Sequence, residues 1–247
     1  MQAREANAAA FKQARALPQP NAAVKSPAHD DASAPDPRMI IAVDGPAASG
    51  KGTIAKALAR HFGLPHMDTG LLYRAVALNL LEMGGDPESE FSAARACDLA
   101  QIDFDDPQLK SEAVGGIASR ISAFPMVREH LLERQRLFAA QAGGAVLDGR
   151  DIGTVIAPDA DAKLFVTASA EVRARRRCHE LRSLGLNVHH EDVLADIHAR
   201  DERDAGRAAS PLVPAADATI IDTSDLDVEE AVAAALAAVE DLTEAAR

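Results

Sequence analysis

The sequence predicts an α/β fold in which a parallel β-sheet is covered by helices on both faces. From Met39 onward, short apolar stretches of strand length alternate with longer stretches in which apolar residues recur at helical spacing. Alternation of this kind favours parallel strands joined by crossover helices. At 247 residues, the chain has the length of one such domain with an insertion, or of at most two domains.

The apolar pattern assigns the individual elements in order. The expected strands are 39–43, 145–148, 163–167 and 218–222. The expected helices are 51–62, 70–83, 126–142, 169–184, 190–205 and 227–245. Residues 85–124 do not fit the alternation, because prolines and aspartates divide them into short amphipathic pieces: Pro87, Asp105, Asp106 and Pro107. We therefore expect an inserted subdomain or lid at one edge of the sheet.

Residues 1–38 differ in composition from the rest of the chain. They carry twelve Ala and five Pro with mixed charges, which is typical of a segment that buries too little apolar surface to fold. A disordered tail is the first interpretation. A transit peptide is the second, although such peptides are poor in acids and this segment contains Glu5, Asp30, Asp31 and Asp36. The third is an over-extended translation start, with the working protein beginning at Met39.

Charge and cysteine content narrow the class of protein. A formal net charge of −12 disfavours a nucleic-acid polymer or a membrane surface as partner, because both attract cations. Cys97 and Cys178 lie far apart without zinc-ligand spacing, so we expect neither a disulfide framework nor a structural metal. No apolar run approaches the roughly 18 residues of a membrane-spanning helix. We expect a soluble cytoplasmic protein.

A phosphate-binding loop follows the first expected strand. Gly45 and Gly50 bracket four residues, and Lys51, Gly52 and Thr53 follow at the start of an expected helix. Such a loop curls its N–H groups around phosphates, and the lysine reaches the outer ones. The alternative is a plain glycine turn between a core strand and a surface helix. The loop predicts a P-loop NTPase type of sheet, with Lys51 reaching the outer phosphates of a nucleotide.

Magnesium is the expected cofactor of such a loop, although one detail departs from the commonest form. Gly52 stands where many phosphate loops place a magnesium-binding hydroxyl, and Thr53 supplies it one position later. We therefore expect Mg²⁺ to be held largely by phosphates and water. Asp148 ends the strand 145–148, where a carboxylate would hold the magnesium water shell. Arg150 and Asp151 follow directly; the alternative for this segment is a polar surface turn.

Two further segments predict a second phosphorylated substrate. In "DTGLLYR", Thr69 and Gly70 begin a helix that presents N–H groups to an anion, and Tyr73 and Arg74 follow. An ordinary capped helix is the alternative.

In "ARDERDAGR", two cations flank a carboxylate at about one helical turn and share a face. Arg200, Asp204 and Arg207 would grip a phosphate and a ribose hydroxyl together. The alternative is a ladder of ion pairs along the helix.

The segment "VRARRRCHELR" concentrates five arginines on one expected helix: Arg173, Arg175, Arg176, Arg177 and Arg182. They repel one another unless bound phosphate or nearby carboxylates compensate. A lid that closes over a transferring phosphoryl group needs such donors, and a solvated charged face is the alternative. His189, His190 and His198 lack a matching ligand set, so we treat them as surface or core histidines.

With these pieces in order, the chain resembles the bacterial cytidylate kinase family of nucleoside monophosphate kinases over residues 39–240. The resemblance rests on five motifs and their intervals: "DGPAASGKGT" at 44–53, "DTGLLYR" at 68–74, "AFPMVRE" at 123–129, "LDGRDIGT" at 147–154 and "RDERDAGRAASPLVPAADA" at 200–218. It implies transfer of the γ-phosphoryl group of ATP to CMP or dCMP with Mg²⁺, giving CDP or dCDP and ADP. It also implies a monomer with a core, a nucleotide-binding insertion at 85–124, and lid and substrate-grip helices at approximately 170–207.

The resemblance also implies roles for single residues. The implied ATP-binding residues are Gly45, Pro46, Ala47, Ala48, Ser49, Gly50, Lys51, Gly52 and Thr53. The implied catalytic residues are Lys51, Arg176, Arg177 and Arg200. The implied CMP site consists of Thr69, Tyr73, Arg74, Ser119, Arg128, Arg150, Asp151, Arg200, Asp204 and Arg207. Chemically, a carboxylate such as Asp151 complements the amino group of cytosine, and donors such as Arg128 and Ser119 complement its acceptors. Uracil would leave these groups unpaired.

Two departures from the family pattern concern the acceptor nucleotide. Thr69 stands where members often carry Ser, and the insertion at 85–124 is shorter than in the longer family members. How the site closes around CMP, and whether it prefers CMP or dCMP, therefore stay open. Two other functions also stay open. One is a phosphotransferase for another small acceptor, and the other is a nucleotide-dependent switch, although the chain contains no N-K-x-D guanine motif.

Overall fold

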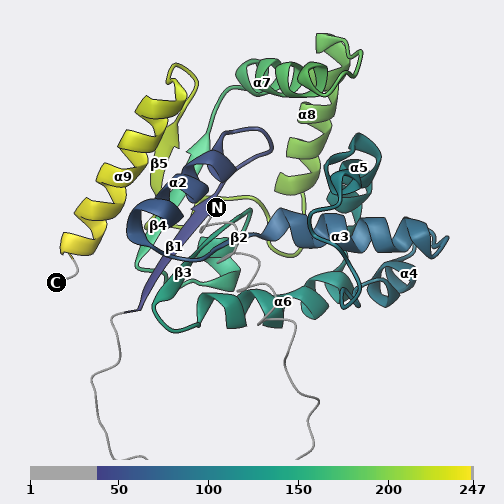
Figure 1. The fold of residues 1–247 in the computed structure, drawn as a ribbon, viewed down its shortest axis with the longest axis horizontal. Helices are drawn as coiled ribbons and strands as arrows, with labels where there is room; N and C mark the ends of the chain where they lie inside the picture. The colour runs from purple at the N-terminus through teal and green to yellow at the C-terminus, as the bar shows by residue number, and fades with distance from the viewer. Residues whose placement is uncertain (1–37, 246–247) are drawn as a thin grey trace, which may run out of the picture.

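A computed structural model describes residues 38–245 and confirms the predicted α/β fold (Figure 1). The described residues form one five-stranded sheet with the order β2-β3-β1-β4-β5, and every pair of neighbouring strands is parallel. The strands are β1 (Met39–Asp44), β2 (His66–Asp68), β3 (Gly144–Gly149), β4 (Ala162–Thr167) and β5 (Thr219–Asp222). Their carboxyl ends therefore meet along one edge of the sheet, where ligands bind in open α/β folds.

Helices connect the strands, and those predicted from the apolar pattern are all present, with their ends within three residues of the expected bounds. They are α2 (Lys51–Phe62), α3 (Thr69–Glu82), α4 (Glu90–Arg95), α5 (Glu112–Ile121), α6 (Pro125–Ala139), α7 (Ala170–Ser183), α8 (His190–Ala205) and α9 (Val228–Ala245). A 3₁₀ turn (Pro107–Lys110) and a π-helical turn (Ile152–Ile156) complete the described elements. Strand β2 was not among the predicted strands, because it has only three residues and two of them are polar.

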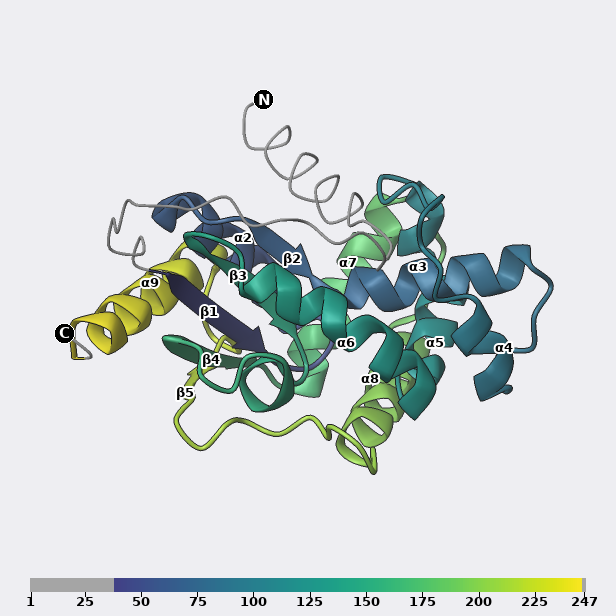
Figure 2. The ribbon, with the colours of Figure 1, turned by 90° about the horizontal axis from the view of Figure 1, so that it is seen from below.

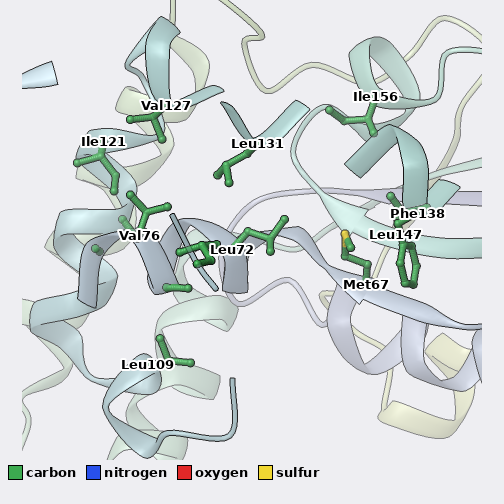
Figure 3. Close-up of a cluster of buried hydrophobic side chains, with 14 of the residues drawn as sticks. Met67, Leu72, Val76, Leu109, Ile121, Val127, Leu131, Phe138, Leu147 and Ile156 are labelled. Atoms are coloured by element: carbon green, nitrogen blue, oxygen red, sulfur yellow. The ribbon is translucent and has the colours of Figure 1, made fainter. Parts of the chain in front are cut away.

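The sheet separates two hydrophobic cores. Because side chains alternate along a strand, Ile40 and Ala42 of β1 join one core, whereas Ile41 and Val43 join the other. The first core lies against α3 and α6, and Figure 3 shows Leu147 of β3 packed in this cluster. The second core lies against α2 and α9. In Figure 2, α9 lies at the opposite end of the molecule from α3, α4 and α5.

Residues 85–124 hold α4, the 3₁₀ turn and α5, which pack against α3. The side chains of Leu109 and Ile121 from this segment are fully buried in the first core (Figure 3). Helices α7 and α8 lie side by side with a small core of their own, and α8 faces α5 across the carboxyl edge of the sheet (Figure 1). The insertion and the α7–α8 pair thus surround the edge where ligands are expected.

Two further sequence predictions concern the N-terminal residues and membrane-spanning helices. The interpretations of residues 1–38 as a tail, a transit peptide or an over-extended start fall outside the described residues, apart from Arg38. Within residues 38–245, no helix combines the length and the apolar character needed to cross a membrane.

Candidate active site

The phosphate loop adopts a conformation that requires its glycines. Gly45 has φ +152° and Gly50 has φ +92°. A Cβ placed on Gly45 would lie 2.0 Å from the carbonyl oxygen of Val166, so the loop passes directly against β4. The N–H groups of Thr53 and Ile54 donate to the Gly50 carbonyl and begin α2. The sequence therefore produces the predicted strand, glycine turn and helix start.

One cavity opens beside this loop and is bounded by α7 and by the segment that joins β5 to α9. Among the nine residues predicted to hold ATP, the six from Ala48 to Thr53 line the cavity, together with Arg176 and Arg177. Gly45, Pro46 and Ala47 lead from β1 into the loop. The cavity contains about 1330 Å³ of space, part of it open to solvent.

Lys51 is the cation of this cavity, and its surroundings perturb it strongly. Burial, followed by the nearby Arg150 guanidinium, lowers the pKa of Lys51 to about 8, although Asp148 and Asp68 act in the opposite direction. Loss of hydration is therefore the main factor that destabilises the charged ammonium. Polyphosphate bound in the loop would stabilise the charged form.

Two carboxylates lie beside Lys51, at the ends of neighbouring strands. Asp68 of β2 and Asp148 of β3 are paired in the register of the sheet. His66 Nε2 lies 2.7 Å from Asp148 Oδ1, and both side chains are buried. Burial, followed by the charge of Asp148, raises the pKa of Asp68. Two such close acids form a region that attracts a cation.

A second cavity lies between α3, α5, α8 and the end of β3, and contains about 600 Å³ of space, part of it open to solvent. All ten residues predicted for the CMP site line it. They are Thr69, Tyr73, Arg74, Ser119, Arg128, Arg150, Asp151, Arg200, Asp204 and Arg207. The fold thus brings together side chains that are up to 138 positions apart in the sequence, counted from Thr69 to Arg207.

Asp204 is the centre of an ion-pair network in this second cavity. Arg150 Nε donates to Asp204 Oδ2 at 2.8 Å, and Arg207 Nη2 donates to Oδ1 of the same carboxylate. Burial alone would raise the pKa of Asp204, but Arg150 and Arg207 outweigh it and lower the pKa. The carboxylate therefore stays ionised between two arginines. Helix α8 ends at Ala205, so Arg207 reaches back from the segment after it.

A second network lies at another wall of the cavity. Arg128 of α6 forms an ion pair with Asp151, and its Nη1 donates to the Ser122 carbonyl at 3.2 Å. Ser122 Oγ accepts a hydrogen bond from Arg207 at 2.8 Å. Ser119 Oγ accepts one from Arg203 Nε at 3.2 Å, which leaves the Ser119 hydroxyl proton free to point elsewhere. A carboxylate and several donors thus lie close together.

The start of α3 differs in detail from the expectation that Thr69 and Gly70 begin a helix with open N–H groups. Asp68 is the capping residue, and its carboxylate accepts the Leu71 N–H at 3.2 Å. The Thr69 hydroxyl donates to the Asp148 carbonyl at 2.9 Å and so ties α3 to β3. Arg74 donates to the Leu109 carbonyl at 2.8 Å. The capping residue is one position earlier because Asp is among the preferred N-cap residues.

The arginine-rich helix α7 is compensated by groups of this chain. Arg173 pairs with Asp201 through two hydrogen bonds of 3.0 and 2.6 Å. Arg177 pairs with Glu112 and Glu180. Of the two explanations that the sequence left open, nearby carboxylates therefore account for these two arginines, in a structure that contains no ligand.

Arg176 of α7, which the resemblance places in a lid, contacts the phosphate loop and the residue that follows β5. Its guanidinium donates to Thr223 Oγ1 at 2.9 Å and to the Thr223 carbonyl at 2.6 Å, and it lies 3.4 Å from the Ser49 carbonyl. Thr223 Oγ1 in turn donates to Ser49 at 3.0 Å. Arg176 therefore fixes α7 to the phosphate loop and to the end of β5.

Several residues of the site were missed by sequence reasoning. Thr223 follows an expected strand directly, so the rule that strand ends carry function points to it. His66 and Ser122 come from a short strand and a helix end that the apolar pattern does not mark. Glu112 is one of many acidic residues, and only the fold places it beside arginines from two other helices.

The parallel sheet, the phosphate loop after its first strand and the two neighbouring cavities define the class: a P-loop protein with the layout of a nucleotide phosphotransferase. Comparison with known proteins gives the family. The cytidylate kinase family profile matches residues 41–241. The chain belongs to the cytidylate kinase family.

Two relatives named as cytidylate kinases agree with the family assignment. The chain is 59% identical over 205 residues to a protein named "Cytidylate kinase" from Methylocella silvestris, covering 82% of this chain and 94% of that protein. A "Cytidylate kinase" from Xanthobacter autotrophicus is 58% identical over 205 residues, with 82% and 97% covered. A solved structure of an uncharacterized protein from Eubacterium ventriosum is 16% identical with a TM-score of 0.48, covering 82% of this chain and 99% of that chain.

Proposed function

We propose that the protein transfers the γ-phosphoryl group of ATP to CMP or dCMP, giving CDP or dCDP and ADP. Family membership supports this activity. The observation that carries it is the pair of neighbouring cavities, one on the phosphate loop and one lined by arginines and two carboxylates. Lys51 of the first cavity lies within electrostatic range of Arg150 and Asp204 of the second. Two nucleotides bound in these cavities would bring their phosphates together.

In this proposal the loop cavity holds ATP, and the loop N–H groups and Lys51 bind its phosphates. Arg177 neutralises charge that spreads over the transferring group, and Arg200 does so from the acceptor side. Arg176, fixed to Thr223 and the loop, shapes the ATP cavity from behind. Guanidinium groups suit this task because their forked donors match phosphate oxygens.

The acceptor nucleotide occupies the second cavity. Thr69, Tyr73 and Arg74 face its phosphate, and Arg150, Arg200 and Arg207 add positive charge. Asp204 is held ionised by two arginines and accepts a ribose hydroxyl. These assignments follow from the chemistry of each group and from its position in the cavity wall.

The Arg128–Asp151 network reads the cytosine base. Asp151 accepts from the amino group of cytosine, and Arg128 and Ser119 donate to its two acceptors. Uracil presents a carbonyl to Asp151 and an N–H to the donors, so buried groups would lose their partners. The ion pair between Arg128 and Asp151 keeps both side chains in place for this recognition.

Magnesium fits the residues beside the loop. Asp148 Oδ1 is engaged by His66, whereas Oδ2 lies 3.7 Å from the position that a Cβ on Gly52 would take, facing the start of α2. Asp68 supplies a second carboxylate. Mg²⁺ binds one or two carboxylates together with phosphates and water, so Asp148 would hold it, with Asp68 beside it. When bound, the ion neutralises charge on the ATP phosphates.

The chain needs no strong general base for this reaction. The attacking oxygen belongs to the acceptor phosphate, which is already ionised. The residues instead have to align the two nucleotides and neutralise their repulsion, which is the main source of catalysis in phosphoryl transfer.

We also propose a division of labour within a cytoplasmic monomer. Residues 85–124 form the acceptor-binding insertion, residues 39–247 form the kinase domain that contains it, and the helices at approximately 170–207 form the lid and the substrate grip.

The test is ADP release from ATP and Mg²⁺ with CMP, dCMP, UMP, AMP and shikimate as acceptors. Turnover confined to CMP and dCMP is the expected result. Turnover with another acceptor would show that CMP is the wrong substrate, but the assignment of the phosphate loop to ATP would stand. Slow ADP release that is independent of any acceptor would indicate a nucleotide-dependent switch.

A further inference from the structure

Glu112 opens α5, and its carboxylate contacts arginines from two other helices. One oxygen accepts a hydrogen bond from Arg177 of α7, and the other accepts one from Arg200 of α8 at 3.3 Å. The two arginine side chains are only 15% and 11% exposed. Glu112, whose own side chain is 39% exposed, therefore links the insertion to both lid helices through two largely buried guanidinium groups.

The two arginines face different cavities. Arg177 lines the cavity of the phosphate loop, and Arg200 lines the cavity of the acceptor. Among the residues that the structure describes, Glu112 lines neither cavity, so it contacts the arginines from outside the space that nucleotides would fill. Its carboxylate thus joins a cation of one cavity to a cation of the other.

The cations near this point need an anion to stay together. Burial, followed by the charges of Arg200 and Arg177, lowers the pKa of Arg74. Three arginines therefore approach one another closely enough to repel. Like charges separate unless an opposite charge holds them. Asp196 pairs with Arg200 at 2.8 Å and Glu180 pairs with Arg177 at 2.6 Å, each within its own helix. Glu112 contacts both arginines and so bridges α7 and α8.

We propose that Glu112 is a positioning residue that holds Arg177 and Arg200 in the arrangement required for phosphoryl transfer. The proposal rests on the proposed function, because it concerns the same reaction. Glu112 contacts neither nucleotide and acts through the two guanidinium groups. Arginines misplaced by about 1 Å lose much of their effect on the transition state, on the order of a hundredfold in rate.

The first experiment compares Glu112→Gln with Glu88→Gln. The Glu112 variant keeps the size of the side chain and loses its charge, so kcat should fall about tenfold or more, with smaller changes in KM for ATP and CMP. Glu88 is the matched control: it belongs to the same insertion and pairs with Arg120 at 2.9 Å, but the two side chains are 72% and 42% exposed. Its variant should keep kcat within about twofold.

A double-mutant cycle with Arg177→Ala separates positioning from a general loss of folded protein. If Glu112 acts through the arginines, Glu112→Gln should lower kcat by a smaller factor in the Arg177→Ala background than in the wild-type background. The same factor in both backgrounds would overturn the proposal. A kcat for Glu112→Gln within about twofold of wild type would overturn it as well.

A charge-retaining variant keeps the test decisive. Glu112→Asp should retain more of the wild-type kcat than Glu112→Gln, and it replaces Glu112→Gln in the cycle if thermal unfolding shows that the Gln variant does not fold. A folded Asp variant no faster than a folded Gln variant would count against the proposal. If the wild-type protein makes no CDP from CMP, the proposed function fails; if it does and Glu112→Gln matches it, only the positioning role fails.

Discussion

Asp44 ends β1, and its carboxylate determines how stable the site is at neutral pH. Its two oxygens accept the Ile152 and Gly153 N–H groups at 2.8 Å each, which fixes the turn directly after Arg150 and Asp151. Burial is the main cause that raises its pKa from 3.8 to about 6, although the two N–H groups act in the opposite direction. A rise of this size corresponds to about 3 kcal/mol of unfolding free energy.

The sign follows from which state binds the proton more tightly. The pKa of Asp44 is higher in the folded protein than in the unfolded chain. Deprotonation of Asp44 therefore lowers the unfolding free energy as the pH rises from 3.8 toward 6, and this destabilisation is complete above about pH 6. Asp44→Asn removes the charge and with it this pH dependence. Between about pH 5 and about pH 7.5, wild type should therefore lose about 1.4 kcal/mol relative to the variant.

Urea unfolding of wild type and Asp44→Asn at the two pH values measures this change. The matched control is Asp98→Asn, because Asp98 is exposed and accepts a single N–H, from Ala100 at 3.1 Å. The free-energy difference between wild type and Asp44→Asn should depend on pH, whereas the difference for the control should stay nearly constant. If the difference in unfolding free energy between wild type and Asp44→Asn stays constant, or favours wild type more at the higher pH, then the pKa of Asp44 is not raised by folding.

Three further predictions concern the loop and the acceptor site. Because the pKa of Lys51 is about 8 in the free protein, kcat/KM for ATP should fall as the pH rises through 8, and a flat profile to about pH 9.5 would contradict this. Gly45→Ala should lower the unfolding free energy by about 2 kcal/mol or more, since its Cβ would lie 2.0 Å from Val166 O, whereas Gly63→Ala, with open space around it, should cost less in the same urea titration. Asp151→Asn should weaken the preference for CMP over UMP by about tenfold or more in kcat/KM, and unchanged selectivity would remove Asp151 from base recognition.

The fold was largely predictable because its signals are local. Apolar runs such as 39–43 and 163–167 mark strands that are buried on both faces, and a loop with two spaced glycines before a lysine occurs in few other contexts. Strand β2 escaped prediction because His66 and Asp68 are polar. His66 is buried where Asp148 accepts its hydrogen bond, and the half-buried Asp68 caps the start of α3. Such pairings are properties of the folded chain.

The walls of the acceptor cavity were predictable where a motif carried them, and all the predicted residues line it. The partners of those residues were not. Arg128 reaches Asp151 across 23 positions, and Arg150 reaches Asp204 across 54, so no spacing rule connects them. The family resemblance placed Arg176 in a lid, and its contacts with Thr223 arise only because β5 ends beside the phosphate loop.

We propose that a single chain moves a phosphoryl group from ATP to a cytidine monophosphate. To test this transfer, the full chain is incubated with γ-labelled ATP, Mg²⁺ and CMP, and the nucleotides are separated. The label should appear in CDP, and Lys51→Met should abolish this product. Label found only in inorganic phosphate, or in another diphosphate when the acceptors compete, would show that CMP is not the acceptor.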